Sequence, residues 1–183
     1  AQDQTVKIPL SDSTVVIRLF QRGLAFYNDG KYQAAIDTAA MAFDMACRLD
    51  GDSLTIGRYI ASSANVLRFA HLALNHLDEA KYYGHLTLDL RRRFLPPSHP
   101  SLATALSGLA QVYLATGDLS TAVSYAEQHL EFNLRLYGNT PHLQTAKAKS
   151  ELGDLYSRTG RMQAAMELLN SALEILDAIG QTP

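Results

Sequence analysis

Apolar residues recur at every third or fourth position along most of this chain, which is the spacing of one face of an α-helix. The clearest stripe consists of Leu102, Leu106, Leu109 and Tyr113. Gly117-Asp118 interrupts it, with Asp118 placed to cap the helix that follows. The pattern therefore predicts helices joined by short turns. The eight predicted helices span residues 13–29, 31–50, 53–74, 77–94, 100–116, 119–136, 141–159 and 161–179.

The predicted helices form pairs, and the same pair repeats along the chain. One alanine in the second helix of each pair marks the repeat, at spacings of 45, 42 and 43 residues: Ala35, Ala80, Ala122 and Ala165. No stretch of five or more residues in this region alternates like a strand. The sequence therefore predicts an all-α fold, an α-solenoid of about four stacked helix pairs.

The repeats lie within residues 13–180, which we expect to form a single domain. Its four repeats cover about residues 13–50, 53–94, 98–136 and 140–179. In the last connection Thr140 precedes Pro141, which predicts that Thr140 is the N-cap of the next helix. Residues 1–12 are interpreted as an N-terminal extension that frays. The alternative is an arm that lies on its own domain or on a neighbour.

Composition excludes several classes of protein. The 183 residues carry 16 Lys+Arg and 18 Asp+Glu, a net charge of −2, so the chain lacks the basic surplus typical of nucleic-acid and anionic-membrane binders. It has no apolar window long enough for a transmembrane helix. The lone Cys47 excludes an internal disulfide framework and, with no Asn-x-Ser/Thr sequon, favours a cytoplasmic location.

Catalytic and metal-binding motifs are missing from the sequence. It contains no G-x-S-x-G, phosphate loop, G-x-G-x-x-G or H-E-x-x-H, so we expect no enzyme activity and no cofactor. No two of its six histidines are spaced i, i+4 on one helix, so we expect no metal site. His129 is expected to pack between repeats. The run Arg91-Arg92-Arg93 is predicted to lie in the last turn of a helix, where its charges complement the helix dipole. The alternative is a contact with an acidic partner or with nucleic acid.

The repeat resembles the tetratricopeptide repeat (TPR). That family has a small residue and then an aromatic in the first helix, a glycine at the turn and an alanine in the second helix. The matching residues beside the marker alanines are Gly23, Ala110 and Gly153; Phe26, Tyr113 and Tyr156; and Gly30, Gly117 and Gly160. The period exceeds the usual ~34 residues, and such long repeats resemble those of kinesin light chains and G-protein-signalling modulators.

The second repeat departs from this pattern at three positions. Arg68 stands where a small residue is usual, His71 replaces the aromatic and Asn75 replaces the turn glycine. We therefore expect local distortion there.

The resemblance implies a right-handed superhelix whose first helices line a concave groove that binds a protein or peptide segment. By the same resemblance, the groove residues are Phe20, Leu24, Tyr27, Asn28, Asn65, Phe69, Leu72, Gln111, Lys147, Glu151, Asp154 and Arg158. The implied function is a non-catalytic interaction scaffold. The alternatives are a peptide-responsive regulatory receptor and the repeat segment of a larger protein.

The last predicted helix carries more apolar residues than one neighbouring helix can cover, among them Leu169, Leu173 and Leu176. We expect a second copy of the chain, downstream sequence or the N-terminal arm to cover this strip. The first of these predicts a homo-oligomer formed through the C-terminal helix.

Overall fold

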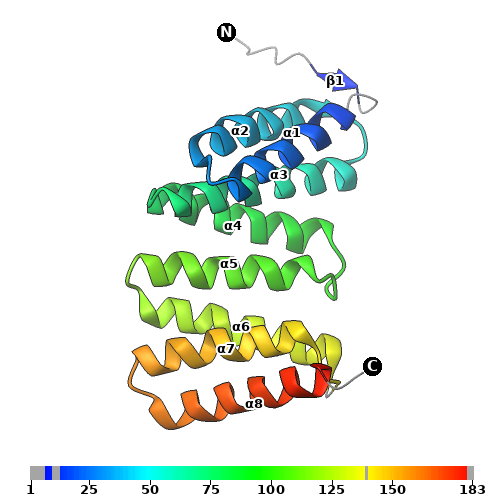
Figure 1. The fold of residues 1–183 in the computed structure, drawn as a ribbon. Coiled ribbons are helices and arrows are strands. Elements are labelled where there is room, and N and C mark those ends of the chain that lie inside the picture. Colours follow the sequence, from blue (N-terminus) through cyan, green and yellow to red (C-terminus); the bar gives the residue numbers. More distant parts are fainter. Residues whose placement is uncertain (1–6, 10–12, 139, 181–183) are drawn as a thin grey trace. The chain divides into compact units, whose positions relative to one another are not determined.

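A computed structural model describes residues 7–9, 13–138 and 140–180 of the chain (Figure 1). This part contains eight helices, at nearly the predicted positions. Their bounds are α1 (Ser13–Asn28), α2 (Tyr32–Arg48), α3 (Ser53–Ala73), α4 (Leu77–Phe94), α5 (Ser101–Ala115), α6 (Leu119–Tyr137), α7 (Leu143–Arg158) and α8 (Met162–Gly180). The all-α prediction is confirmed.

The helices belong to two compact units, and the boundary lies within α5, between Ala105 and Leu106. In the first unit, α1 packs against α2, α2 against α3 and α3 against α4, and α1 also contacts α3. In the second unit, α6 packs against α7 and α7 against α8. Within each unit these helices thus lie beside their neighbours in sequence, as the repeat predicts (Figure 1). The prediction of a single domain over residues 13–180 stays a prediction.

Small residues let the two helices of a pair approach closely. A Cβ atom on Gly23 of α1 would lie 3.3 Å from the Cβ of Ala39 and 3.4 Å from the carbonyl oxygen of Ala35. A Cβ atom on Gly153 of α7 would likewise lie 3.4 Å from the carbonyl oxygen of Ala165. The small residue of the first helix therefore meets the marker alanine of the second.

The turn inside each pair uses a residue with positive φ. Gly30, Gly117 and Gly160 have φ of 75°, 80° and 79°, and Asn75 has φ of 60°. Asparagine is one of the few residues with a side chain that tolerate this region. The amide of Asn75 donates to the carbonyl of Leu72, and the next amide donates to His71, which is the Schellman pattern. The second repeat therefore keeps the regular turn despite its unusual sequence.

Two predicted helix ends require correction. Helix α2 stops at Arg48, two residues early, because Leu49 adopts an extended conformation and begins a short strand. Helix α7 begins at Leu143, and Thr140 is not its cap. The N-cap is His142, whose Nδ1 accepts a hydrogen bond from the amide of Gln144 at 3.1 Å. The imidazole of His142 therefore fills the role that the sequence assigned to a hydroxyl group.

The described part of the N-terminal segment is paired with the first unit. Strand β1 (Ile8–Pro9) runs parallel to β2 (Leu49–Asp50), with Ile8 opposite Leu49. The Nζ of Lys7 lies 3.7 Å from a carboxylate oxygen of Asp50, and both side chains are exposed. For residues 7–9 the alternative of an arm on its own domain is therefore correct, and fraying is wrong. The rest of residues 1–12 lies outside the described residues.

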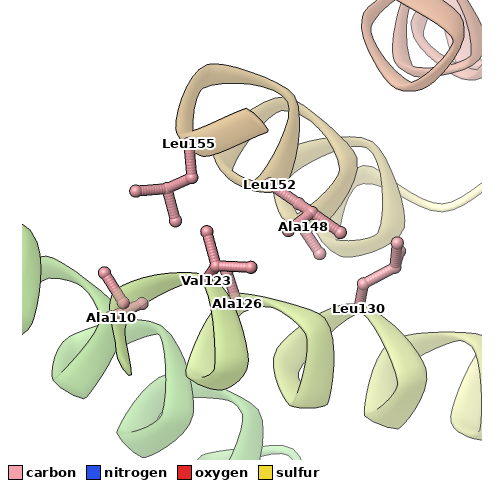
Figure 2. Close-up of a cluster of buried hydrophobic side chains, with 8 residues drawn as sticks. Ala110, Val123, Ala126, Leu130, Ala148, Leu152 and Leu155 are labelled. Atoms are coloured by element: carbon pink, nitrogen blue, oxygen red, sulfur yellow. The ribbon is translucent and has the colours of Figure 1, made fainter. Parts of the chain in front are cut away.

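The core of the second unit is built mainly between α6 and α7 (Figure 2). Val123 and Leu130 of α6 point toward Leu152 and Leu155 of α7. Alanines fill the closer contacts, so large and small side chains interdigitate. The buried alanines of this cluster are Ala110, Ala122, Ala126 and Ala148. In the first unit two smaller clusters centre on Val16, Ala46 and Leu49 and on Ala39, Val66 and Leu67.

We expect Ala122→Leu to destabilise the fold by about 1–3 kcal/mol, because a fully buried alanine at a helix crossing has no room for three more carbons. The matched control is Ala115→Leu, which makes the same change at an exposed helical position. Urea denaturation followed by circular dichroism measures both. Equal midpoints for the two variants would show that the repeat has been aligned on the wrong residue.

Candidate functional site

All twelve predicted binding residues lie on the first helices of the pairs. Phe20, Leu24, Tyr27 and Asn28 belong to α1 of the first unit, and Asn65, Phe69 and Leu72 belong to α3. Gln111 lies in the part of α5 that belongs to the second unit, and Lys147, Glu151, Asp154 and Arg158 lie on α7. That they bind a ligand stays a prediction.

In the first unit the structure brings aromatic residues of α1 and α3 together. The ring centres of Tyr27 and Phe69 are 5.3 Å apart, and those of Tyr27 and Tyr32 are 5.6 Å apart. Tyr27 and Phe69 are half-buried, whereas Leu24 and Asn28 are exposed. The unit therefore presents apolar side chains that are held in place by ring contacts but not fully covered.

The buried side chain of Arg68 packs against Phe69 of this aromatic surface. The Arg68 side chain is 1% exposed, and its guanidinium group lies 3.9 Å from the centre of the Phe69 ring. Nε and Nη2 donate to the Oδ1 atom of Asn65 at 3.4 and 3.3 Å. The residue that broke the repeat pattern is thus an integral part of α3. Asn65 and Phe69 are thus both in contact with Arg68, and both remain partly exposed to solvent.

In the second unit a polar network joins α5, α6 and α7. The hydroxyl of Ser107 donates to one carboxylate oxygen of Glu151 at 3.0 Å, and Nδ1 of His129 lies 2.8 Å from the other. The amide of Gln111 donates to Ser107 at 3.4 Å. Both oxygens of Glu151 therefore have internal partners. The prediction that His129 packs between repeats is confirmed.

The end of α7 carries opposite charges that neutralise each other. Nε of Arg158 donates to Asp154 at 2.8 Å, and both side chains are about half-exposed. Nearby, the hydroxyl of Tyr156 donates to Glu127 at 2.8 Å while Arg161 stacks over its ring at 4.0 Å. Partial burial, together with Glu127, raises the pKa of Tyr156 and keeps its hydroxyl protonated. These groups offer hydrogen bonds and exchangeable ion pairs to a ligand.

Reactive groups are scarce in the described residues. No cluster of three or more His, Cys, Asp or Glu side chains there could hold a metal ion. His71 and His76 meet across a turn, with their Nδ1 atoms 3.4 Å apart, although they are five residues apart and do not have the i, i+4 spacing of a pair on one helix. Cys47 is an exposed residue, but neighbouring groups partly shield its thiol from water. This desolvation, reinforced by the negative charge of Asp44, raises the pKa of the thiol and disfavours the nucleophilic thiolate.

The prediction that Arg91, Arg92 and Arg93 lie in the last turn of a helix is confirmed, since all three belong to the last turn of α4. Arg91 is buried at 8% exposure, whereas Arg92 and Arg93 are exposed. The sequence did not indicate which arginine would turn inward, because that depends on how the connection to α5 folds back.

In the described ranges, no helix is long and apolar enough to cross a membrane.

Comparison with protein-family models identifies two matches along the chain. One model described as tetratricopeptide repeat matches residues 59–135, and a second with the same description matches residues 146–175. Together they cover more than half of the chain, including parts of both units.

Among curated proteins, the chain is similar to Protein KINESIN LIGHT CHAIN-RELATED 1 of Arabidopsis thaliana. The two are 24% identical over 148 residues, which is 81% of this chain and 24% of the relative. The chain therefore spans about a quarter of the length of that protein.

Two solved structures show the same fold at low sequence identity. BtubC (BKLC) from P. vanneervenii aligns with a TM-score of 0.80 at 17% identity, covering 92% of this chain and 65% of that one. The apo form of RapI aligns with a TM-score of 0.74 at 12% identity, covering 92% and 45%. From its repeats, its turns and these matches, the chain belongs to the tetratricopeptide repeat family of protein-interaction scaffolds, with an α-solenoid fold like that of kinesin light chain relatives.

Proposed function

We propose that this chain is a non-catalytic adaptor that binds a protein or peptide segment through the first helices of its repeats. The observation that carries the proposal is the half-exposed aromatic surface of α1 and α3. Tyr27 and Phe69 are fixed by their ring contact, and Leu24 stands exposed beside them on α1. Rigid aromatic side chains that are partly open to water are typical anchors for a protein ligand.

The two units would contribute different chemistry to binding. The first supplies apolar and aromatic contacts through Tyr27, Phe69 and Leu72, whereas the second supplies polar groups through Gln111 and Lys147. The first unit would favour apolar side chains of a ligand, and the second would favour hydrogen-bonding or charged groups. Glu151 would act mainly by organising this surface, because both of its oxygens are already engaged.

Two other functions remain as alternatives within the same architecture. In a regulatory receptor, a bound peptide would change the curvature of the repeat stack. Small-angle scattering with and without a binding peptide separates this from a rigid scaffold, because only the receptor would change its radius of gyration. The other alternative is that the chain is the repeat segment of a larger protein, which agrees with its coverage of a quarter of the plant relative. The lone cysteine favours a cytoplasmic location.

The outer face of α8 is proposed as the contact for a second copy of the chain. Aligned on Ala122 and Ala165, Met166 and Leu173 of α8 correspond to Val123 and Leu130 of α6. In α6 those residues are buried against α7, whereas in α8 they are 53% and 58% exposed. This stripe is therefore the one that the repeat normally covers with a following helix. A further repeat outside this sequence is the alternative occupant.

Replacing the anchors by Tyr27→Leu plus Phe69→Leu should reduce ligand binding at least about tenfold, because aromatic anchors typically contribute about 2 kcal/mol or more each. Leucine keeps an apolar contact between α1 and α3, so the fold should persist. Peptides selected from a displayed random library on the native chain provide the ligands, and fluorescence anisotropy measures their Kd.

The matched control for this experiment is Tyr82→Leu, which removes an exposed aromatic from α4, a second helix of its pair. We expect it to leave the Kd unchanged. If the folded double variant bound the selected peptides as tightly as the native chain, the proposed surface would be excluded. Loss of binding in Tyr82→Leu alone would move the site to the opposite helices.

Sedimentation velocity tests the proposed self-association through α8. The native chain should show a concentration-dependent dimer, and Leu173→Glu should abolish it because a carboxylate would be desolvated in the apolar contact. Met41→Glu introduces the same charge at an exposed methionine of α2 and should leave the dimer intact. A native chain that stayed monomeric at the highest soluble concentration would contradict the proposal.

A further inference from the structure

The first unit also contains a polar cavity, lined by residues other than those of the aromatic surface. A cavity of about 160 Å³ opens between the first half of α3, the last turns of α4 and the connection into α5. None of the twelve predicted binding residues lines it. Its polar lining consists of Arg58, Ser62, Arg91, His99 and Ser101. The volume is many times the ~10–15 Å³ that one water molecule needs, so the cavity has room for a polar group of several atoms.

The buried cation of this cavity is Arg91. Its side chain lines the cavity at 8% exposure, and Nη1 donates to the carbonyl oxygen of Ser101 at 2.7 Å. Burial lowers the pKa of Arg91 to about 10, which still leaves the group charged at neutral pH. No carboxylate of the described residues forms an ion pair with it. Buried charges in proteins are normally paired, so this one lacks its counter-charge.

The surroundings of Arg91 favour a negative group. Arg58 adds an exposed cation at the rim of the cavity. Nδ1 of His99 accepts a hydrogen bond from the amide of Ser101 at 3.2 Å, so the proton of the neutral ring sits on Nε2, which is left to donate. Ser101 also begins α5, whose N-terminal end carries a partial positive charge. Two arginines, one imidazole N–H and a helix end thus surround the same space.

A purely structural role accounts for only part of this arrangement. The hydrogen bond from Arg91 to Ser101 ties the end of α4 to the start of α5 and uses one of the five N–H donors of the guanidinium group. A clamp of this kind needs neither a second arginine nor an open cavity beside it. The planar fork of arginine matches the two oxygens of a carboxylate or phosphate group.

We propose that this cavity binds an oxyanion, a carboxylate or phosphate group of a ligand, held by Arg91 with Arg58 and His99. The site is independent of the aromatic surface, and either can fail without the other. It would give the first unit a second point of contact, specific for charge where the aromatic surface is specific for apolar groups.

The test is a titration of the native chain with inorganic phosphate and, separately, with acetate, at constant ionic strength. The side-chain Nε–H resonances of the arginines are followed by NMR. We expect a saturable shift of the Arg91 resonance, and the probe that produces it distinguishes phosphate from carboxylate chemistry. Arg58→Ala should weaken binding about tenfold, the loss of one charge-assisted hydrogen bond.

Arg92→Ala is the matched control, because it removes the same charge from the same turn of α4 at an exposed position outside the cavity lining. It should change the affinity by less than about twofold. No saturable shift of Arg91 with either anion in the native chain would overturn the proposal. Equal weakening by Arg58→Ala and Arg92→Ala would also overturn it, because binding would then reflect general charge and not this cavity.

Discussion

The fold of this chain depends on how closely the first and second helices of a repeat can approach. At Gly23 and Gly153 the space that a side chain would occupy is already bounded by the backbone of the partner helix, close to Ala35 and Ala165. A larger residue at either position of such a pair would push the helices apart. Because the crossing is fixed at one place in these two pairs, it also fixes which face of α1 and of α7 is covered by the second helix and which remains exposed.

Much of the architecture could be predicted because its signals are local. Helical spacing, aspartate caps and turn glycines act within a few residues of one another, and Asn75 adopts the same backbone conformation as the glycines that it replaces. Features that depend on distant segments were missed. The pairing of Ile8 with Leu49 ends α2 early, and the connection to α5 buries Arg91. Neither contact leaves a pattern in the neighbouring sequence.

The candidate site shows the same division. Repeat position was enough to place the predicted residues on first helices, but it gave no information on what their side chains would contact. Glu151 is held by Ser107 and His129, and Asn65 is held by the buried Arg68. These residues therefore organise the surface as much as they present it. Half of the predicted residues are exposed: Leu24, Asn28, Gln111, Lys147, Asp154 and Arg158.

The most direct test is to place a photo-crosslinking amino acid at Leu24 on α1 and, in a second protein, at Met41 on α2. Both residues are exposed, and they sit on the first and second helix of the same repeat. With a peptide selected on the native chain, we expect efficient crosslinking from position 24 and background levels from position 41. Crosslinking from position 41 with none from position 24 would contradict the claim that the first helices form the binding surface.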